Sequence, residues 1–212
     1  MSREVVKLGG SLYRDPARLE EALAWLADEG ARTPLVVVPG GGPYADAVRR
    51  RQQALGLDDE TAHVAALEAM DRAAGWLTQT RRIGMLVDDI KALDGAAAPV
   101  AVYAPARAFA ADRTLPRSWA TTSDTIALAL AQTLDAPELT LVKSSPPPSL
   151  APAELAAAGF LDPAFPARLA LRPLPVTVLP VTGPHCRPQR VRLMPLKFPE
   201  RVDDTPRQAP AS

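Results

Sequence analysis

Residues 4–11 of the chain read EVVKLGGS, and residues 35–43 read LVVVPGGGP. In each stretch a short apolar run ends at a cluster of glycines, and the β-branched run at residues 35–38 is typical of a strand buried on both faces. We expect a helix capped by Asp15 after the first cluster and a helix extending through Ala54 after the second. Two strand–glycine–helix units in succession favour an α/β fold.

The same alternation continues through the first two thirds of the chain. Further strands are predicted at residues 83–87, 100–103, 139–142 and 176–179. One helix is predicted to begin near Asp58 or Asp59, and another at Thr122 or Ser123. The first of these carries an apolar face that we expect to pack in the core or across a subunit interface, formed by Leu67, Met70, Ala74 and Leu77. The pattern predicts a largely parallel sheet with helices on its faces.

Composition excludes several classes of protein. The 212 residues suit one medium-sized domain, and 24 basic residues balance 24 acidic ones, so no basic surface for nucleic acid is indicated. No apolar run approaches the roughly 20 residues of a membrane span. The one cysteine, Cys186, is consistent with a reducing compartment, and we expect a cytoplasmic protein without a metal site of its own. His185 beside Cys186 suggests a catalytic pair only weakly, because neighbours in a strand point in opposite directions.

The sequence changes character after residue 143. Residues 144–148 read SSPPP, which predicts a stiff loop, and prolines recur to the C-terminus. A short helix is expected at residues 153–158. We therefore predict a folded domain over residues 1–182 and a partly irregular Pro- and Arg-rich tail over residues 183–212.

The two glycine clusters are candidate anion sites. Gly9 and Gly10 precede Ser11, and Gly40, Gly41 and Gly42 form the second cluster. Glycines allow the backbone to approach an oxyanion closely, and the N-terminus of a following helix offers free N–H groups. Either cluster alone could be a tight turn, but two clusters at the carboxyl ends of strands indicate a polyanion or two anions brought together.

Three charged residues accompany these loops. Lys7 and Lys143 stand at or near the ends of apolar strands, where an unpaired charge costs desolvation energy. A lysine ammonium is a compact partner for phosphate oxygens. Asp124 falls in the first turn of a predicted helix, where it could stabilise the helix dipole or orient active-site lysines.

Two better-known phosphate motifs fit poorly. The pattern G-x-x-x-x-G-K-[ST] of P-loop enzymes is absent. Residues 40–45 satisfy the loose dinucleotide pattern, but Asp58 and Asp59, at the distance where that motif needs an acid, lie at a helix start rather than a strand end. A dinucleotide-binding oxidoreductase would also leave Lys7 and the first glycine loop unused.

These motifs together resemble the amino acid kinase superfamily, which includes acetylglutamate, aspartate, uridylate and carbamate kinases. The resemblance is carried by residues 6–11 (VKLGGS), 38–42 (VPGGG) and 123–124 (SD). Residues 63–71 (HVAALEAMD), 119–124 (WATTSD) and 141–143 (LVK) are similar to the branch of aminomethylfuran phosphate kinases of methanofuran biosynthesis.

The resemblance implies a three-layer αβα sandwich and an ATP- and Mg²⁺-dependent kinase that phosphorylates a small anionic acceptor, a phosphate monoester in that branch. It also implies a homo-oligomer. Lys7 would contact the transferring phosphoryl group and Asp124 would orient Lys7. Gly9, Gly10 and Ser11 would bind the nucleotide phosphates, with Lys143 on the nucleotide side. The acceptor would lie against Gly40, Gly41 and Gly42, and Mg²⁺ would be carried mainly by the nucleotide.

The chain departs from the family at two points. Family members commonly have an acidic, glycine-containing loop where residues 144–148 read SSPPP, and a later lysine used by several relatives has no clear match. Either Lys143 takes over that lysine's role, or nucleotide binding has been altered or lost. The alternative function is a non-catalytic ligand-binding or assembly subunit that keeps the kinase fold.

Overall fold

The sheet has seven strands in the order β3-β4-β2-β1-β5-β6-β7 within the described part of the chain. The protein is represented by a computed structural model that describes residues 3–93, 98–183 and 189–195. The pairs from β3 to β6 are parallel, and β7 runs antiparallel to β6. The strands are β1 (Glu4–Leu8), β2 (Leu35–Pro39), β3 (Met85–Val87), β4 (Val100–Tyr103), β5 (Leu139–Lys143), β6 (Val176–Pro180) and β7 (Val191–Arg192).

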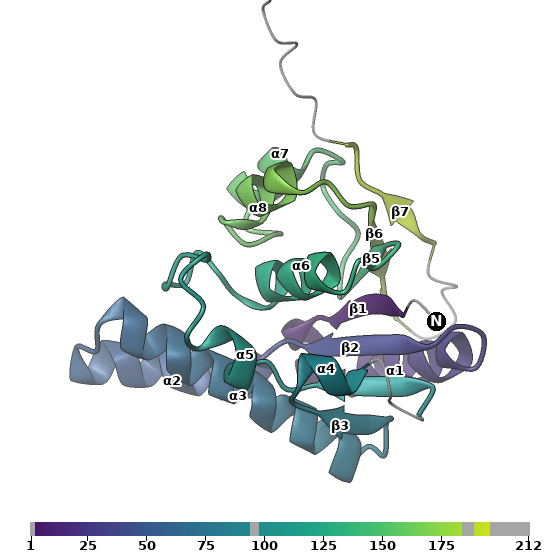
Figure 1. The fold of residues 1–212 in the computed structure, drawn as a ribbon, viewed down its shortest axis with the longest axis horizontal. Helices are drawn as coiled ribbons and strands as arrows, with labels where there is room; N and C mark the ends of the chain where they lie inside the picture. The colour runs from purple at the N-terminus through teal and green to yellow at the C-terminus, as the bar shows by residue number, and fades with distance from the viewer. Residues whose placement is uncertain (1–2, 94–97, 184–188, 196–212) are drawn as a thin grey trace, which may run out of the picture.

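Helices cover both faces of this sheet, so the predicted three-layer αβα sandwich is confirmed (Figure 1). One core lies between the sheet and the layer of α6, α7 and α8, and the other lies between the sheet and α1; the long α3 contributes to both. The helical segments are η1 (Gly10–Arg14), α1 (Pro16–Gly30), α2 (Gly42–Leu55), α3 (Asp59–Gln79), α4 (Ile90–Leu93), α5 (Ala106–Phe109), α6 (Ser123–Thr133), α7 (Pro152–Ala157) and α8 (Phe165–Leu171).

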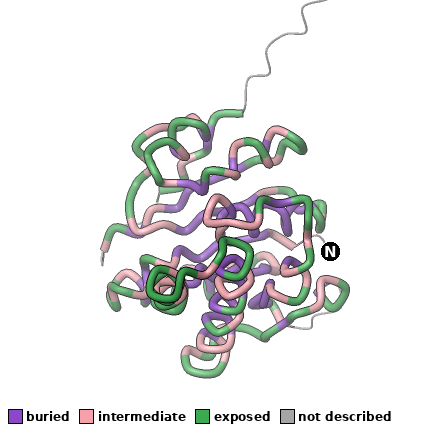
Figure 2. The backbone as a smooth tube through the Cα atoms, turned by 90° about the vertical axis from the view of Figure 1, so that its left-hand side faces the viewer, coloured by how far each residue is buried: buried purple, intermediate pink, exposed green. Residues whose placement is uncertain are grey.

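The alternation of side chains along β1 decides which way its lysine points. Val5 packs in the core beside α6, whereas Val6 and Leu8 pack in the core beside α1. Because successive side chains of a strand point to opposite faces, Lys7 lies on the α6 side. The buried residues gather in the central strands and in the helices beside them (Figure 2).

The loops that follow β1, β2 and β5 meet at one edge of the sheet. β1 pairs with β2 on one side and with β5 on the other, although β5 is separated from β1 by most of the domain. The Gly40 N–H donates to the Leu8 carbonyl at 2.8 Å, and the Gly9 N–H donates to the Val142 carbonyl at 2.9 Å. The ends of β1, β2 and β5 therefore form one continuous edge, the usual place for a ligand in an open α/β sheet.

The predicted strands and long helices are present, with boundaries within two residues at most ends. The apolar face formed by Leu67, Met70, Ala74 and Leu77 packs in the core. The final third of the chain is more regular than its prolines indicated, because it contains α8, and β7 extends the sheet into the predicted tail. His185 and Cys186 lie outside the described residues. Among the described helices, none combines the length and the apolar character that a membrane span requires.

Candidate active site

The two glycine loops pack directly against each other. A Cβ atom on Gly40 would lie 2.5 Å from the Gly10 nitrogen, and a Cβ on Gly10 would lie 2.7 Å from the Gly42 nitrogen. Gly42 also has a φ of +49°, a conformation that side chains disfavour. Glycine is therefore required on both loops because their backbones touch. The loops form one surface, with η1 following the first and α2 following the second.

Above this surface, Lys7, Asp124 and Lys143 form a buried group of three charges. The Lys7 Nζ lies 2.9 Å from Asp124 Oδ1, and the Lys143 Nζ lies 2.6 Å from Asp124 Oδ2. The side chains of Lys7 and Asp124 are only 6% and 5% exposed. Lys143 is aligned for a hydrogen bond to Oδ2, whereas the contact of Lys7 is an ion pair without hydrogen-bond alignment. The three residues come from β1, α6 and β5, and the structure brings them together as a unit.

The charges of the two lysines outweigh the effect of burial on Asp124. Burial alone would raise the pKa of this carboxyl, but Lys143 and Lys7 hold its pKa at about 2. Burial lowers the pKa of Lys143, and the nearby Lys7 lowers it further, while the Asp124 carboxylate opposes both effects. Two ammonium groups face the Asp124 carboxylate, so these three side chains carry a net positive charge beside the first glycine loop, which the nearby Asp162 carboxylate partly offsets. Such an excess suits a ligand that is itself an anion.

The proline-containing loop after β5 lies beside the first glycine loop. The hydroxyl groups of Ser11 and Ser144 lie 2.9 Å apart, and Arg18 donates to the Ser144 carbonyl at 3.0 Å. Lys143 also donates to the Phe160 carbonyl at 2.8 Å, which fixes its ammonium from a second direction. The loop after β5 is thus held in place by contacts with η1 and α1.

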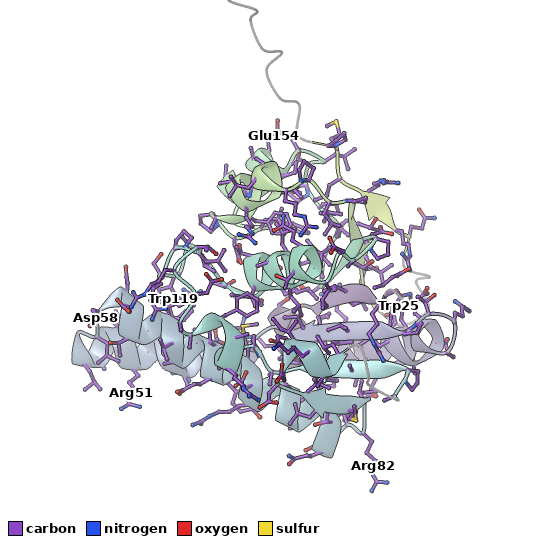
Figure 3. The ribbon with its side chains drawn as sticks, viewed as in Figure 1. Trp25, Arg51, Asp58, Arg82, Trp119 and Glu154 are labelled. Atoms are coloured by element: carbon purple, nitrogen blue, oxygen red, sulfur yellow. The ribbon has the colours of Figure 1, made fainter. Side chains whose placement is uncertain are left out.

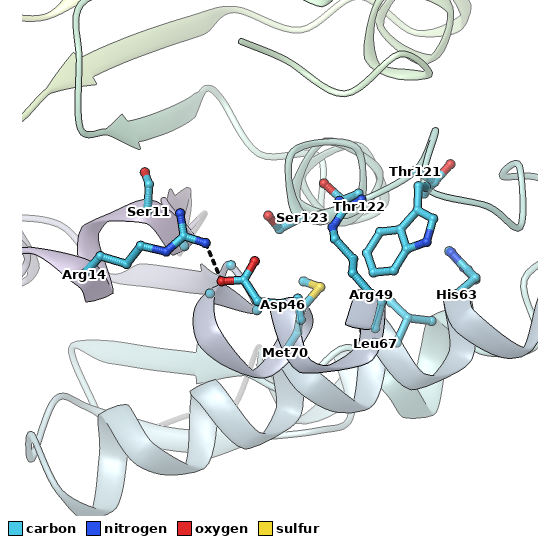
Figure 4. A pocket seen from close by; sticks show the side chains of 17 residues that line it. Ser11, Arg14, Asp46, Arg49, His63, Leu67, Met70, Thr121, Thr122 and Ser123 are labelled. Atoms are coloured by element: carbon cyan, nitrogen blue, oxygen red, sulfur yellow. Dashed lines mark hydrogen bonds and ion pairs between the residues drawn. The ribbon is translucent and has the colours of Figure 1, made fainter. Parts of the chain in front are cut away.

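A pocket of about 180 Å³ opens from the glycine loops toward α2 and α3 (Figure 4). Gly10, Gly40, Gly41 and Gly42 line one end, and the first turn of α6 lines the side. Apolar side chains such as Leu67 and Met70 contribute to the lining, together with five charged or aromatic ones: Arg14, Asp46, Arg49, His63 and Trp119. Arg14 and Asp46, which both line the pocket, form an ion pair (Figure 4). The predicted substrate-binding glycines therefore border an actual cavity of small-molecule size.

Arg49 and Trp119 are functional candidates that were not predicted from the sequence. The Arg49 guanidinium lies 3.6 Å from the centre of the Trp119 ring, and no ion pair of Arg49 is present within the described ranges. The Trp119 Nε1–H donates to Gln52 at 2.6 Å, and Gln52 in turn donates to Asp59 at 3.0 Å. Trp119 and Asp58 lie at the same end of the molecule (Figure 3). Arg49 thus lies over a ring that is itself held by a hydrogen bond, a good arrangement for binding an anion.

Part of the pocket lining could have been predicted from the sequence, as one face of helix α2. Asp46 and Arg49 are three residues apart on α2 and face the pocket together.

His63 is buried on α3. Burial, followed by the charge of Arg117, lowers the pKa of His63, which favours the neutral imidazole at pH 7. Asp58, the acid considered for a dinucleotide motif, instead accepts a hydrogen bond from the Thr61 N–H as the cap of α3.

The groups present suit phosphate oxygens better than a metal ion bound by the protein. The described residues contain no group of three His, Cys, Asp or Glu side chains that could hold a metal ion. Both oxygens of Asp124 face lysines, so this carboxylate is poorly placed to bind Mg²⁺. The glycine N–H groups and the lysine ammonium groups are ligands for phosphate oxygens.

Comparisons with known proteins agree with this geometry. Residues 2–93, which include Lys7 and both glycine loops, match the amino acid kinase family. The chain is 29% identical over 138 residues to the (5-(aminomethyl)furan-3-yl)methyl phosphate kinase of Methanocaldococcus jannaschii. That match covers 64% of this chain and 62% of the relative, so the chain spans less than two thirds of the curated protein.

The fold is similar to that of solved kinases. The uridylate kinase of Archaeoglobus fulgidus is 16% identical and superimposes with a TM-score of 0.62, covering 85% of this chain and 91% of that one. The aspartate kinase of Synechocystis is 15% identical, with a TM-score of 0.63 over 95% of this chain and 41% of that one. The predicted fold class and the predicted resemblance are confirmed.

Proposed function

We propose that this chain, which shares the amino acid kinase fold and matches that family over residues 2–93, is an ATP-dependent phosphotransferase for a small anionic acceptor. The observation that carries the proposal is the buried group of Lys7, Asp124 and Lys143 beside two fused glycine loops. Excess positive charge and a surface of backbone N–H groups are the features that phosphoryl transfer requires.

In this proposal the nucleotide lies over the first glycine loop. The backbone N–H groups of Gly9, Gly10 and Ser11 would donate to its phosphates, and Lys7 would contact the transferring phosphoryl group. Asp124 would orient both lysines, because one oxygen faces each of them. Lys143 would then serve in place of the later lysine of other family members. When bound, Mg²⁺ would neutralise charge on the nucleotide phosphates.

The acceptor would occupy the 180 Å³ pocket, with its anionic group against Gly40, Gly41 and Gly42. The relative from M. jannaschii suggests an aminomethylfuran phosphate as the acceptor. Arg49 would assist in binding the phosphate, and Asp46 would face the amine with the carboxylate oxygen that Arg14 does not contact. In this assignment a positive and a negative side chain of the pocket lining each face a group of the opposite charge on the acceptor.

The residues present suffice for the chemistry. Phosphoryl transfer has a loose, in-line transition state, so alignment and charge stabilisation contribute most of the rate enhancement. A phosphate acceptor is already anionic and needs no general base. The main barrier is repulsion between two anions, which Lys7 and the facing glycine loops would reduce.

The contact between Ser11 and Ser144 favours a second candidate function. The hydroxyl groups 2.9 Å apart join the proline loop to the loop proposed for the nucleotide phosphates. If this contact does not open for ATP, the chain would be a non-catalytic ligand-binding or assembly subunit that retains the kinase fold. Such a protein would bind acceptor-like anions in the pocket without turnover.

Calorimetric titration of the protein with ATP and Mg²⁺, beside Lys7→Ala, separates these functions. We expect binding that the substitution weakens, followed by ADP release when the acceptor is added. Aminomethylfuran phosphate, uridylate and aspartate should be compared as acceptors. Absence of nucleotide binding in folded protein, or unchanged ADP release by Lys7→Ala, would contradict the kinase proposal. Light scattering of the same samples would test the predicted homo-oligomer.

A further inference from the structure

Asp162 is a buried carboxylate that the proposed reaction does not use. It lies between α7 and α8 and is 7% exposed. Its Oδ2 accepts hydrogen bonds from the backbone N–H groups of Thr122 and Thr125, each at 2.9 Å, and its Oδ1 accepts from the Thr122 hydroxyl at 2.5 Å. All three donors belong to the N-terminal end of α6.

The N-terminus of α6 depends on this carboxylate. Thr122 is the N-cap residue, but its side chain makes no capping hydrogen bond within the helix and donates to Asp162 instead. Residues 123–132 of α6 are all buried, so water cannot easily satisfy the first N–H groups of the helix. Asp162 therefore acts as a cap supplied from a distant part of the chain. Asp124 is the second residue of this helix, and its position follows from that of the helix end.

The same segment holds one of the two lysines. The Phe160 carbonyl accepts a hydrogen bond from Lys143 Nζ at 2.8 Å, and the Phe160 ring lies 5.0 Å from that ammonium group. Two residues later, Asp162 holds the helix that carries Asp124. Farther along, the Ala164 N–H donates to the Ala120 carbonyl at 2.9 Å, beside the pocket wall. The connection from α7 to α8 thus contacts Lys143 directly and holds the end of the helix that carries Asp124.

We propose that Asp162 is a positioning residue that fixes Asp124 between Lys7 and Lys143 through the N-terminus of α6. This inference rests on the proposed phosphotransferase function and adds a determinant outside the glycine loops and the lysines. Because a displacement of about 1 Å can reduce a catalysed rate about 100-fold, a loosened helix end would lower turnover without removing any group that contacts the reactants.

Two substitutions separate the geometry of this cap from its charge. Asp162→Asn keeps an oxygen for the two N–H donors, and its amide group can donate to the Thr122 hydroxyl. We expect its kcat to stay within about threefold of the wild-type value, because the geometry is retained. Asp162→Ala removes the cap, and we expect kcat to fall about 10- to 100-fold while KM for ATP changes less than about threefold. Asp162→Ser, which is one bond shorter, replaces the alanine variant if that variant does not fold.

Asp58→Ala is the matched control. Asp58 caps α3 through the Thr61 N–H at 2.7 Å, but α3 carries none of the three charged residues of the proposed catalytic group. Loss of the Asp58 cap should lower the free energy of unfolding and leave kcat unchanged. If Asp162→Ala likewise loses stability alone and keeps kcat, Asp162 is only a structural cap and the proposal is overturned.

Lysine-selective ¹⁵N NMR supplies a readout that does not need turnover. The chain has four lysines, Lys7, Lys91, Lys143 and Lys197, so their ammonium signals can be assigned by substitution. We expect slowly exchanging signals from Lys7 and Lys143 in the wild type and in Asp162→Asn, and their loss in Asp162→Ala. If the wild type releases no ADP with any acceptor, the proposed function fails, and the lysine signals still decide whether Asp162 orders the lysines. Unchanged lysine signals in Asp162→Ala would overturn the positioning role.

Discussion

Replacing Asp124 with asparagine should destabilise the protein in a manner that depends on pH. The substitution keeps the size of the side chain but leaves Lys7 and Lys143, 6% and 12% exposed, without their shared counter-charge. The fall in the pKa of Asp124 from its ordinary value of 3.8 to about 2 corresponds to about 2 kcal/mol of stability at neutral pH. Removing one partner of a buried ion pair typically costs about 3–5 kcal/mol, because the remaining charge is left uncompensated. We expect a loss of about 3 kcal/mol at pH 7.

The sign of the pH dependence follows from the lysines. Burial and the charge of Lys7 lower the pKa of Lys143, and Asp124 opposes this effect in the wild type. Without Asp124 the folded-state pKa of Lys143 should fall further below its unfolded value of about 10.4. The unfolded variant then binds more protons than the folded one between those two values, so the variant should recover stability as the pH rises toward 10.

Urea unfolding followed by circular dichroism at pH 7, 8 and 9.5 would measure both effects relative to the wild type. Asp15→Asn is a suitable control, because Asp15 caps α1 at the surface and pairs with Arg18 rather than with a lysine. The difference between Asp124→Asn and the wild type should narrow with rising pH, whereas the control should show no such trend. A variant as stable as the control at pH 7, or a deficit that stays constant up to pH 9.5, would refute the reasoning.

Three further predictions follow from the site. At acid pH the ionised Asp124 should lose its stabilising effect as the pH falls from about 4 through about 2, so urea unfolding should show wild type and Asp124→Asn converging there. Gly40→Ala places a Cβ atom 2.5 Å from a backbone nitrogen and should lower the melting temperature and abolish activity; Gly75→Ala, whose nearest atom is 3.9 Å away in α3, should instead stabilise by up to about 1 kcal/mol. Arg49→Gln should raise KM for the acceptor about 10- to 100-fold in steady-state assays, because it removes a charged hydrogen-bond donor. KM for ATP should not change in that variant, and equal effects on both substrates would argue against an acceptor role for Arg49.

Local patterns along the chain predicted most of the secondary structure. The apolar runs at residues 4–8 and 35–38, the cap at Asp15 and the periodic face of α3 are properties of a few neighbouring residues. Each is set by side-chain periodicity or by the hydrogen bonds of a helix end. The same approach missed α8, because it is only seven residues long in a proline-rich region, and β7, because two residues have no periodicity.

The sequence pointed to individual residues of the candidate site, but it did not predict that they lie in contact with one another. Lys7 and Lys143 were noticeable because a charge at the end of a buried strand is costly. That both ammonium groups face the same carboxylate depends on β5 pairing with β1, which no local pattern specifies. Arg49 and Trp119 come from separate elements, and their stacking is likewise a tertiary contact.

The sequence by itself determined the α/β class, the two glycine loops and the strand-end lysines, because strand periodicity, turn chemistry and desolvation act over a few residues. Only the tertiary structure decided that the two loops touch, that Asp124 lies between two lysines, and that Asp162 caps the helix carrying Asp124. The physical reason is that these contacts join residues far apart in the chain. They form only when the order of strands in the sheet brings the ends of β1, β2 and β5 to one edge and packs α6 against it.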